Sequence, residues 1–279
     1  MPSPRPELGA ALDHVCLQSP QPQALAEFLE LAYAMKRTPG ESGWQCTAPD
    51  RSLLVREGHP NSIAFFSYAF DSRERLKAHR RALEEKGIVP GANPSPLFDG
   101  DAHALQDPDG NMVAFGLRTR SSNDSNEPLP ARLQHLGLRT PRIDEMVAFY
   151  ESLGFVVSDR VRCDEGMLRA CFLRTDHEHH ALALFRAPEA RFDHISCETR
   201  DIASVVAWAD RMAGDGIPIH WGIGRHGPGN DVFFMVKDPD GNLVEISADI
   251  EVCEGARPAG TWKHEQRTLN LWGNAIMRS

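Results

Sequence analysis

The chain of 279 residues lacks the features that mark membrane-spanning, secreted and nucleic-acid-binding proteins. No stretch approaches 18 consecutive apolar residues, and the first residues, Met1 to Pro6, contain no hydrophobic signal segment. An excess of basic residues is also absent, because 30 Lys and Arg are opposed by 39 Asp and Glu, which leaves a net charge of −9. We therefore expect no nucleic-acid partner and no membrane partner, and we predict a cytoplasmic location.

Cysteine is scarce, and its spacing excludes two further classes of protein. The six cysteines are scattered and form no CxxC pair: Cys16, Cys46, Cys163, Cys171, Cys197 and Cys253. A disulfide framework and a zinc–thiolate site are therefore not expected, and the thiols are predicted to be reduced. The length fits one large or two medium domains, at roughly 100 to 200 residues per domain.

The chain contains an internal repeat, because three segments of its first half recur in the same order in its second half. The matching segments begin at Ala11 and Arg132, at Asp71 and Asp201, and at Asp107 and Asp238. The last pair is the clearest, since both copies read Asp-Pro-Asp-Gly-Asn. We predict an N-terminal module at 1–120, a polar linker at 121–130 and a C-terminal module at 131–279.

The pattern of apolar residues predicts the order of helices and strands within each module. In the second module, a strand near 135–139 precedes a helix over 143–153 and three strands, at 155–158, 168–174 and 181–185. A second unit follows, with strands at 192–197, 232–237 and 243–247 and a helix over 201–213. The Asp238–Asn242 segment suits a hairpin turn. We therefore predict an α+β fold with two βαβββ units in each module.

Only the second copy carries three polar residues at the matched strand positions. Alignment of the copies pairs His135 with His14, His194 with Ala64, and Glu245 with Ala114. A carboxylate and two imidazoles on mostly apolar strands must be paired or bound to a cation, because an unpaired buried charge is strongly destabilising. Two imidazoles and one carboxylate match the triad that holds non-haem Fe(II) and leaves coordination positions open.

At these residues the chain resembles the two-module type I extradiol ring-cleaving dioxygenases of the vicinal oxygen chelate superfamily. The resemblance follows Gly224-Arg-His226-Gly-Pro-Gly-Asn, an apolar strand, the Asp238 turn and Glu245. The tail, with Thr261-Trp-Lys and Leu271-Trp-Gly-Asn, is similar to the homoprotocatechuate branch. The resemblance implies a cup-shaped mixed sheet in each module, a first module that acts as a scaffold, and a catalytic second module. We also expect a homo-oligomer.

The resemblance assigns roles to five residues. It implies that His135, His194 and Glu245 bind Fe(II), or Mn(II), with O2 as co-substrate and a small aromatic diol as substrate. His180, which lies 14 residues before His194, matches the acid–base histidine, and His226 matches a histidine that hydrogen-bonds the substrate oxygens. An imidazole suits proton transfer because its ordinary pKa, about 6.5, lies near neutrality. The expected reaction opens a catechol to a muconic semialdehyde-type product.

Two departures from the family pattern bear on the substrate. Met235 stands where the signature has a tyrosine, and Trp221 stands where the homoprotocatechuate branch has an arginine that binds a carboxylate. An apolar wall therefore replaces an anion contact, and we expect a hydrophobic or neutral catechol. Arg225 and Arg267 remain candidate contacts for a substrate anion.

Two other functions remain open on the same scaffold. One is a redox-neutral, metal-dependent isomerase or lyase, and the other is a non-catalytic protein that binds an aromatic ligand. The histidines also have a simpler interpretation, because His177, His179 and His180 could form a solvated turn. His226 lies in a Gly- and Pro-rich loop, where polar residues are common for reasons of turn geometry.

Overall fold

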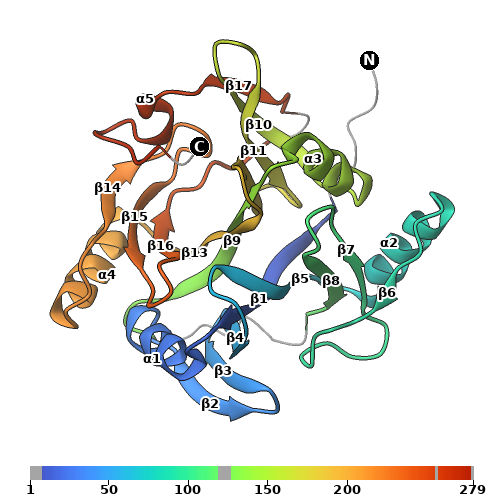
Figure 1. The fold of residues 1–279 in the computed structure, drawn as a ribbon, viewed down its shortest axis with the longest axis horizontal. Helices are drawn as coiled ribbons and strands as arrows, with labels where there is room; N and C mark the ends of the chain where they lie inside the picture. Colours follow the sequence, from blue (N-terminus) through green and yellow to red (C-terminus); the bar gives the residue numbers. More distant parts are fainter. Residues whose placement is uncertain (1–7, 119–126, 255–256, 278–279) are drawn as a thin grey trace.

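The structure of the chain, a computed structural model, describes residues 8–118, 127–254 and 257–277. These residues form two mixed sheets, one of eight strands and one of nine, with helices against them (Figure 1). The predicted linker, 121–130, falls largely outside the described residues. None of the helices in the described part is long and apolar enough to cross a membrane.

The first sheet contains two βαβββ units. Its first unit consists of β1 (Ala10–Ser19), α1 (Pro22–Ala32), β2 (Lys36–Gly40), β3 (Gly43–Ala48) and β4 (Arg51–Glu57). The second consists of β5 (Ser62–Phe70), α2 (Arg73–Glu85), β6 (Gly91–Ala92), β7 (His103–Gln106) and β8 (Met112–Leu117). The strand order is β2-β3-β4-β1-β5-β8-β7-β6, so the first strands of the two units pair at the centre.

The second sheet repeats this plan and adds a C-terminal strand. One unit consists of β9 (Ala131–Thr140), α3 (Ile143–Ser152), β10 (Val156–Arg162), β11 (Leu168–Arg174) and β12 (Leu182–Arg186). The other consists of β13 (Arg191–Thr199), α4 (Ile202–Gly214), β14 (Trp221–Arg225), β15 (Val232–Lys237) and β16 (Leu243–Ala248), followed by β17 (Gly260–Lys263) and α5 (Gln266–Leu269). The order β14-β15-β16-β13-β9-β12-β11-β10-β17 confirms the predicted α+β fold.

Local signals in the sequence explain several element boundaries. Helix α4 begins where the side chain of Asp201 accepts a hydrogen bond from the Ser204 amide. Helix α2 is capped in the same way by Ser72, one residue after the predicted Asp71. In the predicted hairpin, Asp238 accepts hydrogen bonds from two backbone amides of its own turn, and Gly241 supplies a φ of +84°.

The two modules share one hydrophobic core and are joined by buried hydrogen bonds. Tyr33, at the end of α1, points its hydroxyl at the backbone carbonyls of Ile195 and Glu245, at 3.0 and 2.9 Å. The Tyr68 hydroxyl donates to the Ala181 carbonyl at 3.0 Å. The first module therefore contacts the backbone of the strands that carry the predicted metal ligands.

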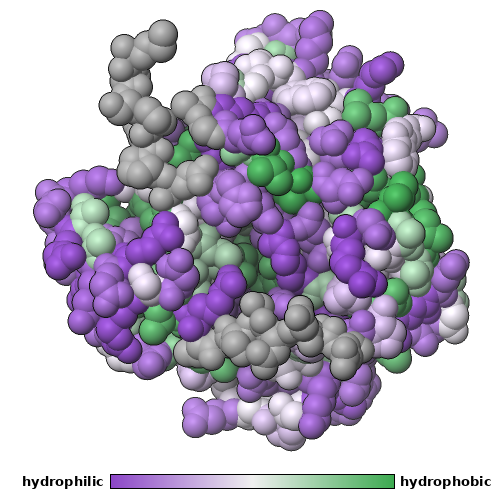
Figure 2. Space-filling model, turned by 180° about the vertical axis from the view of Figure 1, so that it is seen from behind, coloured by the Kyte–Doolittle hydropathy of each residue, from purple (hydrophilic) through white to green (hydrophobic). Residues whose placement is uncertain are grey.

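Polar residues cover most of the outer face seen in Figure 2, with hydrophobic patches between them.

The strand register corrects one pair in the predicted alignment of the two copies. His135 pairs with Ser196 across the sheet, and His14 pairs with Ser67 in the same way. The first-module counterpart of His194 is therefore Phe65, and the predicted pairing with Ala64 is wrong. The error arises because the prediction matched Asp71 with Asp201, whereas the residue that caps α2, and so corresponds to Asp201, is Ser72.

Candidate metal centre and substrate pocket

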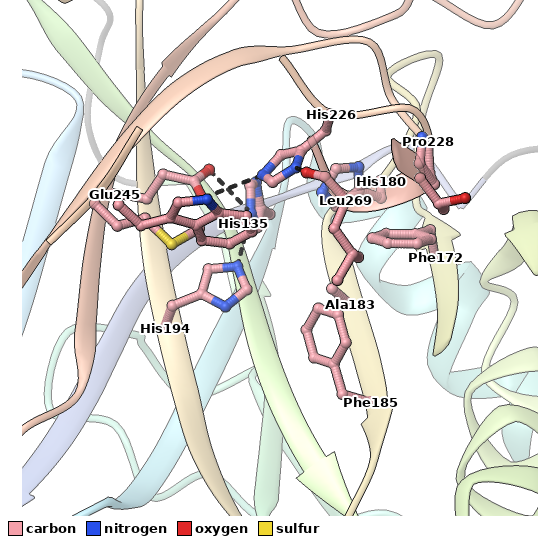
Figure 3. A pocket seen from close by; sticks show the side chains of 13 residues that line it. His135, Phe172, His180, Ala183, Phe185, His194, His226, Pro228, Glu245 and Leu269 are labelled. Carbon is pink, nitrogen blue, oxygen red and sulfur yellow. Dashed lines mark hydrogen bonds and ion pairs between the residues drawn. The ribbon is translucent and has the colours of Figure 1, made fainter. Parts of the chain in front are cut away.

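The three predicted metal ligands meet on three neighbouring strands, β9, β13 and β16. The Nε2 atoms of His135 and His194 lie 3.0 Å apart, and Oε1 of Glu245 lies 3.6 Å from Nε2 of His135. One potential ligand atom from each residue falls within 4.8 Å of the others, and all three residues are buried (Figure 3). The structure therefore brings together the three side chains that the sequence predicted to share an ion.

The neighbouring side chains orient both imidazoles for metal binding. The Gln134 amide oxygen contacts Nδ1 of His135, and an Asp193 carboxylate oxygen lies 2.8 Å from Nδ1 of His194. These acceptors place a ring proton on each Nδ1, so the lone pairs on the Nε2 atoms converge. Two lone pairs 3.0 Å apart repel unless a cation lies near them. The donor set therefore fits a divalent metal of the kind that two imidazoles and a carboxylate bind.

His194 can occupy its position because residue 137 is glycine. Gly137 pairs with His194 across the sheet. A Cβ atom on Gly137 would lie 2.3 Å from atoms of the His194 ring, well inside van der Waals contact. The absence of a side chain therefore creates the space that this imidazole fills.

A second group of potential ligands shares Glu245 and includes a residue that the sequence analysis missed. His226, Asp231 and Glu245 also bring ligand atoms within 4.8 Å of one another. Burial raises the pKa of Asp231 to about 7, with opposing effects from the charges of His226 and Glu245. The signal for Asp231 was its spacing, two residues before Phe233 and four before Met235, which is the period of one strand face, although Asp231 itself directly precedes β15.

His226 is held at the edge of the pocket with one nitrogen engaged. Its Nδ1 donates to the Leu269 carbonyl at 2.6 Å, and its ring stacks on Phe233 with 3.7 Å between centroids. Nε2 lies 3.8 Å from the Glu245 carboxylate. Burial alone would lower the pKa of His226, but the charges of Asp231 and Glu245 raise it above the usual 6.5. The imidazole is therefore suited to donate a proton near neutrality.

His180 is buried beside the predicted metal ligands, so the interpretation as a solvated turn is wrong for His179 and His180, although His177 is exposed. Only 3% of His180 and 0% of His179 is exposed. The His180 ring lies 4.3 Å from the His135 ring and 5.1 Å from the Phe172 ring, centroid to centroid. Burial lowers the pKa of His180 well below 6.5, with the neighbouring histidines acting in the same direction. The imidazole is therefore neutral near pH 7 and can accept a proton.

A buried histidine and carboxylate lie behind His180, and neither was found from the sequence. Nδ1 of His179 lies 3.0 Å from Nδ1 of His180, and Nε2 of His179 lies 3.1 Å from Oδ2 of Asp159. Asp159 also accepts hydrogen bonds from Trp262 and Arg257, at 2.6 and 3.1 Å. Burial alone would raise the pKa of Asp159, but these contacts lower it to about 2. The carboxylate therefore stays ionised and favours a proton on Nε2 of His179.

The pocket around these groups is narrow and mainly apolar. Its cavity volume is about 30 Å³. Two small hydrophobic clusters flank it, one containing Phe172 and Phe185 and the other Trp221 and Met235. The full lining consists of His135, Phe172, His180, Ala183, Phe185, His194, Trp221, His226, Pro228, Met235, Glu245, Thr268 and Leu269. No lysine or arginine belongs to this lining, which gives the pocket little attraction for a substrate anion.

The two predicted anion contacts lie away from the pocket. Arg225 donates to the Asn230 carbonyl at 2.5 Å, and its guanidinium also lies over the Trp272 ring. Arg267 is exposed on α5. A register shift between Gly222 and Gly224 in β14 explains the position of Arg225: Trp221 pairs with Met235, which lines the pocket, whereas Arg225 pairs with Val232, which does not. Neither arginine belongs to the lining of the pocket.

Comparison with known proteins agrees with this geometry. Residues 132–246 match the Glyoxalase/Bleomycin resistance protein/Dioxygenase superfamily. Metapyrocatechase 2 of Cupriavidus necator is 28% identical over 299 aligned positions, which cover 94% of this chain and 88% of that protein. The manganese-dependent 2,3-dihydroxybiphenyl 1,2-dioxygenase of Geobacillus genomosp. 3 is 30% identical over 122 residues, covering 43% of this chain and 38% of that enzyme.

The similarity of fold extends over both modules. The crystal structure of homoprotocatechuate 2,3-dioxygenase from Arthrobacter globiformis has a TM-score of 0.81 and 22% identity, covering 99% of this chain and 91% of that one. The Mn(II)-bound glyoxalase from Novosphingobium aromaticivorans has a TM-score of 0.75 and 22% identity, covering 94% and 90%. The resemblance seen in the sequence is thus supported for the C-terminal module, which matches the Glyoxalase/Bleomycin resistance protein/Dioxygenase superfamily over residues 132–246, and the similar curated proteins include a metapyrocatechase and a 2,3-dihydroxybiphenyl 1,2-dioxygenase.

Proposed function

We propose that this chain is a metal-dependent extradiol dioxygenase that opens the ring of a neutral catechol with O2. The observation that carries the proposal is the convergence of His135, His194 and Glu245 on one point at the edge of an apolar pocket. The names of the relatives support the same class of reaction, since they include metapyrocatechase and a dihydroxybiphenyl dioxygenase. The expected product is a muconic semialdehyde.

The proposed metal is Fe(II), with Mn(II) as the alternative, because two imidazoles and a carboxylate accept both ions. His135, His194 and Glu245 would hold it. When bound there, a divalent ion would supply a positive charge that lowers the pKa of the catechol hydroxyls and a redox centre through which ring and O2 could exchange electrons. The carboxylate of Glu245 offsets part of the ion's charge in a buried site, where an uncompensated charge would be costly.

The protein supplies the proton transfers through two histidines. His180 is neutral, and contact with His179 directs its Nδ1 proton away from the pocket, so its Nε2 can accept a hydroxyl proton from the substrate. The same nitrogen can return that proton when the ring opens. His226 has a raised pKa and a Nδ1 proton bound to a backbone carbonyl, so it can donate from Nε2 to a substrate oxygen.

The pocket walls select the substrate and exclude water. Phe172, Phe185 and Trp221 offer aromatic surface on which a flat ring can pack. Met235 and Leu269 complete an apolar enclosure. A carboxylate on the ring would lose its hydration without gaining a cationic partner, which is unfavourable. We therefore infer a preference for catechols without a charged substituent.

The test is reconstitution under anaerobic conditions with Fe(II) or Mn(II), followed by O2 and a panel of catechols. We expect oxygen uptake and a yellow product with unsubstituted or alkyl catechols, and a higher KM with a carboxylated catechol. The His194→Ala protein, treated in the same way, is the control for adventitious metal chemistry. The proposal fails if the wild-type protein binds one equivalent of metal yet consumes no oxygen with any catechol.

A further inference from the structure

The first module has a large cavity at the position where the second module has its metal pocket. Its volume is about 500 Å³, compared with about 30 Å³ for the metal pocket. Strands β1, β3, β4 and β5 form its wall, and the loop at 94–97 lies over it. These strands pair in the register of β9, β11, β12 and β13 in the second module.

The register shows that equivalent residues line both pockets. Cys16 pairs with Leu54, and Gly137 pairs with Ala183 in the same way. Counting along the paired strands from these positions matches each first-module residue with its second-module equivalent. The pairs are Cys16 and Gly137, Gln45 and Phe172, Leu54 and Ala183, Arg56 and Phe185, and Phe65 and His194. The large cavity is therefore the interior of the first module's cup and is separate from the catalytic pocket.

This cup has lost the residues needed to bind a metal. Phe65 replaces the second imidazole, and Ala114 replaces the carboxylate. The remaining histidine, His14, is engaged at both nitrogens, with Asp13 at 2.7 Å from Nδ1 and Ser95 at 2.6 Å from Nε2. A metal site is therefore excluded here, although the cavity has been retained.

The cup has instead gained a cation on an apolar wall. Arg56 is half-buried, and its guanidinium forms no ion pair or hydrogen bond with another residue of the described chain. Its neighbours on the cavity wall include Leu54, Phe65 and Leu97, with the amide of Gln45 nearby. A guanidinium held beside apolar surface is favourable when an anion supplies the opposite charge, because it offers planar, paired donors to a carboxylate.

We propose that the first module binds a small aromatic monocarboxylate in this cup. The carboxylate would lie on Arg56 and the amide of Gln45, and the ring would pack on Leu54 and Phe65. A single negative charge fits better than a phosphate, because Arg56 is the one cationic residue among those that line the cavity. The other charged lining residue, Glu41, is exposed at the mouth and disfavours a multiply charged ligand.

The test is calorimetric titration of the full-length protein with benzoate, alongside benzamide, a neutral analogue of the same shape. We expect benzoate to bind with an affinity that falls as salt is raised, and benzamide to bind at least tenfold more weakly. Arg56→Gln should weaken benzoate binding about tenfold or more, whereas Arg81→Gln, which removes an exposed arginine on α2, should not. Leu54→Trp should weaken both ligands by filling the cavity, and a thermal melt verifies that each variant is folded.

Metal removal distinguishes the two cups. Because the proposed site contains no metal ligand, benzoate should bind equally well before and after treatment with a chelator. The chelated protein, which has lost its metal, should show no oxygenase turnover. The proposal is overturned if benzamide binds as tightly as benzoate, if Arg56→Gln retains full affinity, or if chelation abolishes binding. The last result would place benzoate in the second module. None of these readings depends on ring-cleavage activity.

Discussion

The Nδ1 atoms of His179 and His180 lie 3.0 Å apart in a buried contact, so His179 can fix the orientation and the proton position of the His180 ring. One of the two nitrogens must donate and the other must accept. Asp159, 3.1 Å from the far nitrogen of His179, settles which one, since its carboxylate attracts the ring proton to that side. His180 is thereby kept with its Nε2 unprotonated, the form that a base requires.

We expect Asp159→Asn to lower kcat by about ten- to a hundredfold while leaving KM for the catechol nearly unchanged. The amide no longer favours one tautomer of His179, so His180 loses its defined protonation. Steady-state kinetics across pH would measure the effect, which should include a shifted acidic limb of the kcat profile. Asp164→Asn, which changes an exposed carboxylate after the same strand, is the matched control. Equal kcat in both variants would show that Asp159 does not control the protonation of His180.

Acid stability offers an independent check on Asp159. Its folded-state pKa, about 2, lies below the ordinary 3.8, so ionisation of the carboxyl favours the folded state. This stabilisation is fully present above about pH 4 and is lost as the pH falls towards 2. The difference in unfolding free energy between wild type and Asp159→Asn should therefore narrow from pH 6 to pH 3 in urea titrations. A difference that widens towards low pH would contradict the assigned direction.

Metal content can separate the two overlapping ligand groups. We expect His194→Ala to lose bound metal by at least tenfold, because it removes a ligand from the buried triad. Asp231→Asn should retain the metal, since Asp231 belongs to the alternative group with His226. Elemental analysis after dialysis against a buffered Fe(II) or Mn(II) solution would give both values. The opposite pattern would move the ion to the His226 side of Glu245.

The space that Gly137 leaves for the His194 ring can be tested by adding a single methyl group, which changes no charge or hydrogen-bonding group. Gly137→Ala adds a methyl group that would lie 2.3 Å from the His194 ring, so the ring must move and metal affinity should fall about tenfold or more. Gly91→Ala is the control, because its new Cβ would meet its nearest neighbour, the Ala104 carbonyl, at 3.7 Å. Both proteins should fold, which circular dichroism would verify. Normal metal binding by Gly137→Ala would show that the imidazole has room to shift.

The size of the substrate that the narrow pocket accepts should increase when the wall formed by Leu269 of α5 is cut back. Leu269→Ala removes apolar volume from the lining and replaces no histidine. We expect kcat/KM for a biaryl catechol to rise severalfold relative to unsubstituted catechol. Competition between the two substrates would measure this ratio directly. An unchanged ratio would mean that another wall, such as Phe172 or Phe185, limits substrate size.

The parts of the site that depend on local sequence could be predicted, and those that depend on tertiary pairing could not. His135, His194 and Glu245 were found because the duplicated halves allow matched positions to be compared. Asp159 was not predicted, and His179 was considered only as part of a turn, because their contact requires β10 to lie near the segment before β12. The predicted location in the cytoplasm and the homo-oligomeric state stay predictions.

The fold shows the same division. The βαβββ order followed from apolar periodicity and from the repeated Asp-Pro-Asp-Gly turn, since both are properties of adjacent residues. The match of His194 with Ala64 was wrong by one residue, because the two helices were matched at Asp71 and Asp201, although the first is capped by Ser72. Arg225 was expected near the substrate, but the register shift in its strand and its hydrogen bond to the Asn230 carbonyl direct it elsewhere.

The hydroxyl of Tyr33 reaches from one half of the duplicated chain to the peptide groups of Ile195 and Glu245 in the other. The first module, which lacks the second histidine and the carboxylate, thus holds in place the backbone of the strands that carry them in the second module. A substitution at Tyr33 is consequently expected to displace the Glu245 carboxylate, although Tyr33 is not itself part of the metal site.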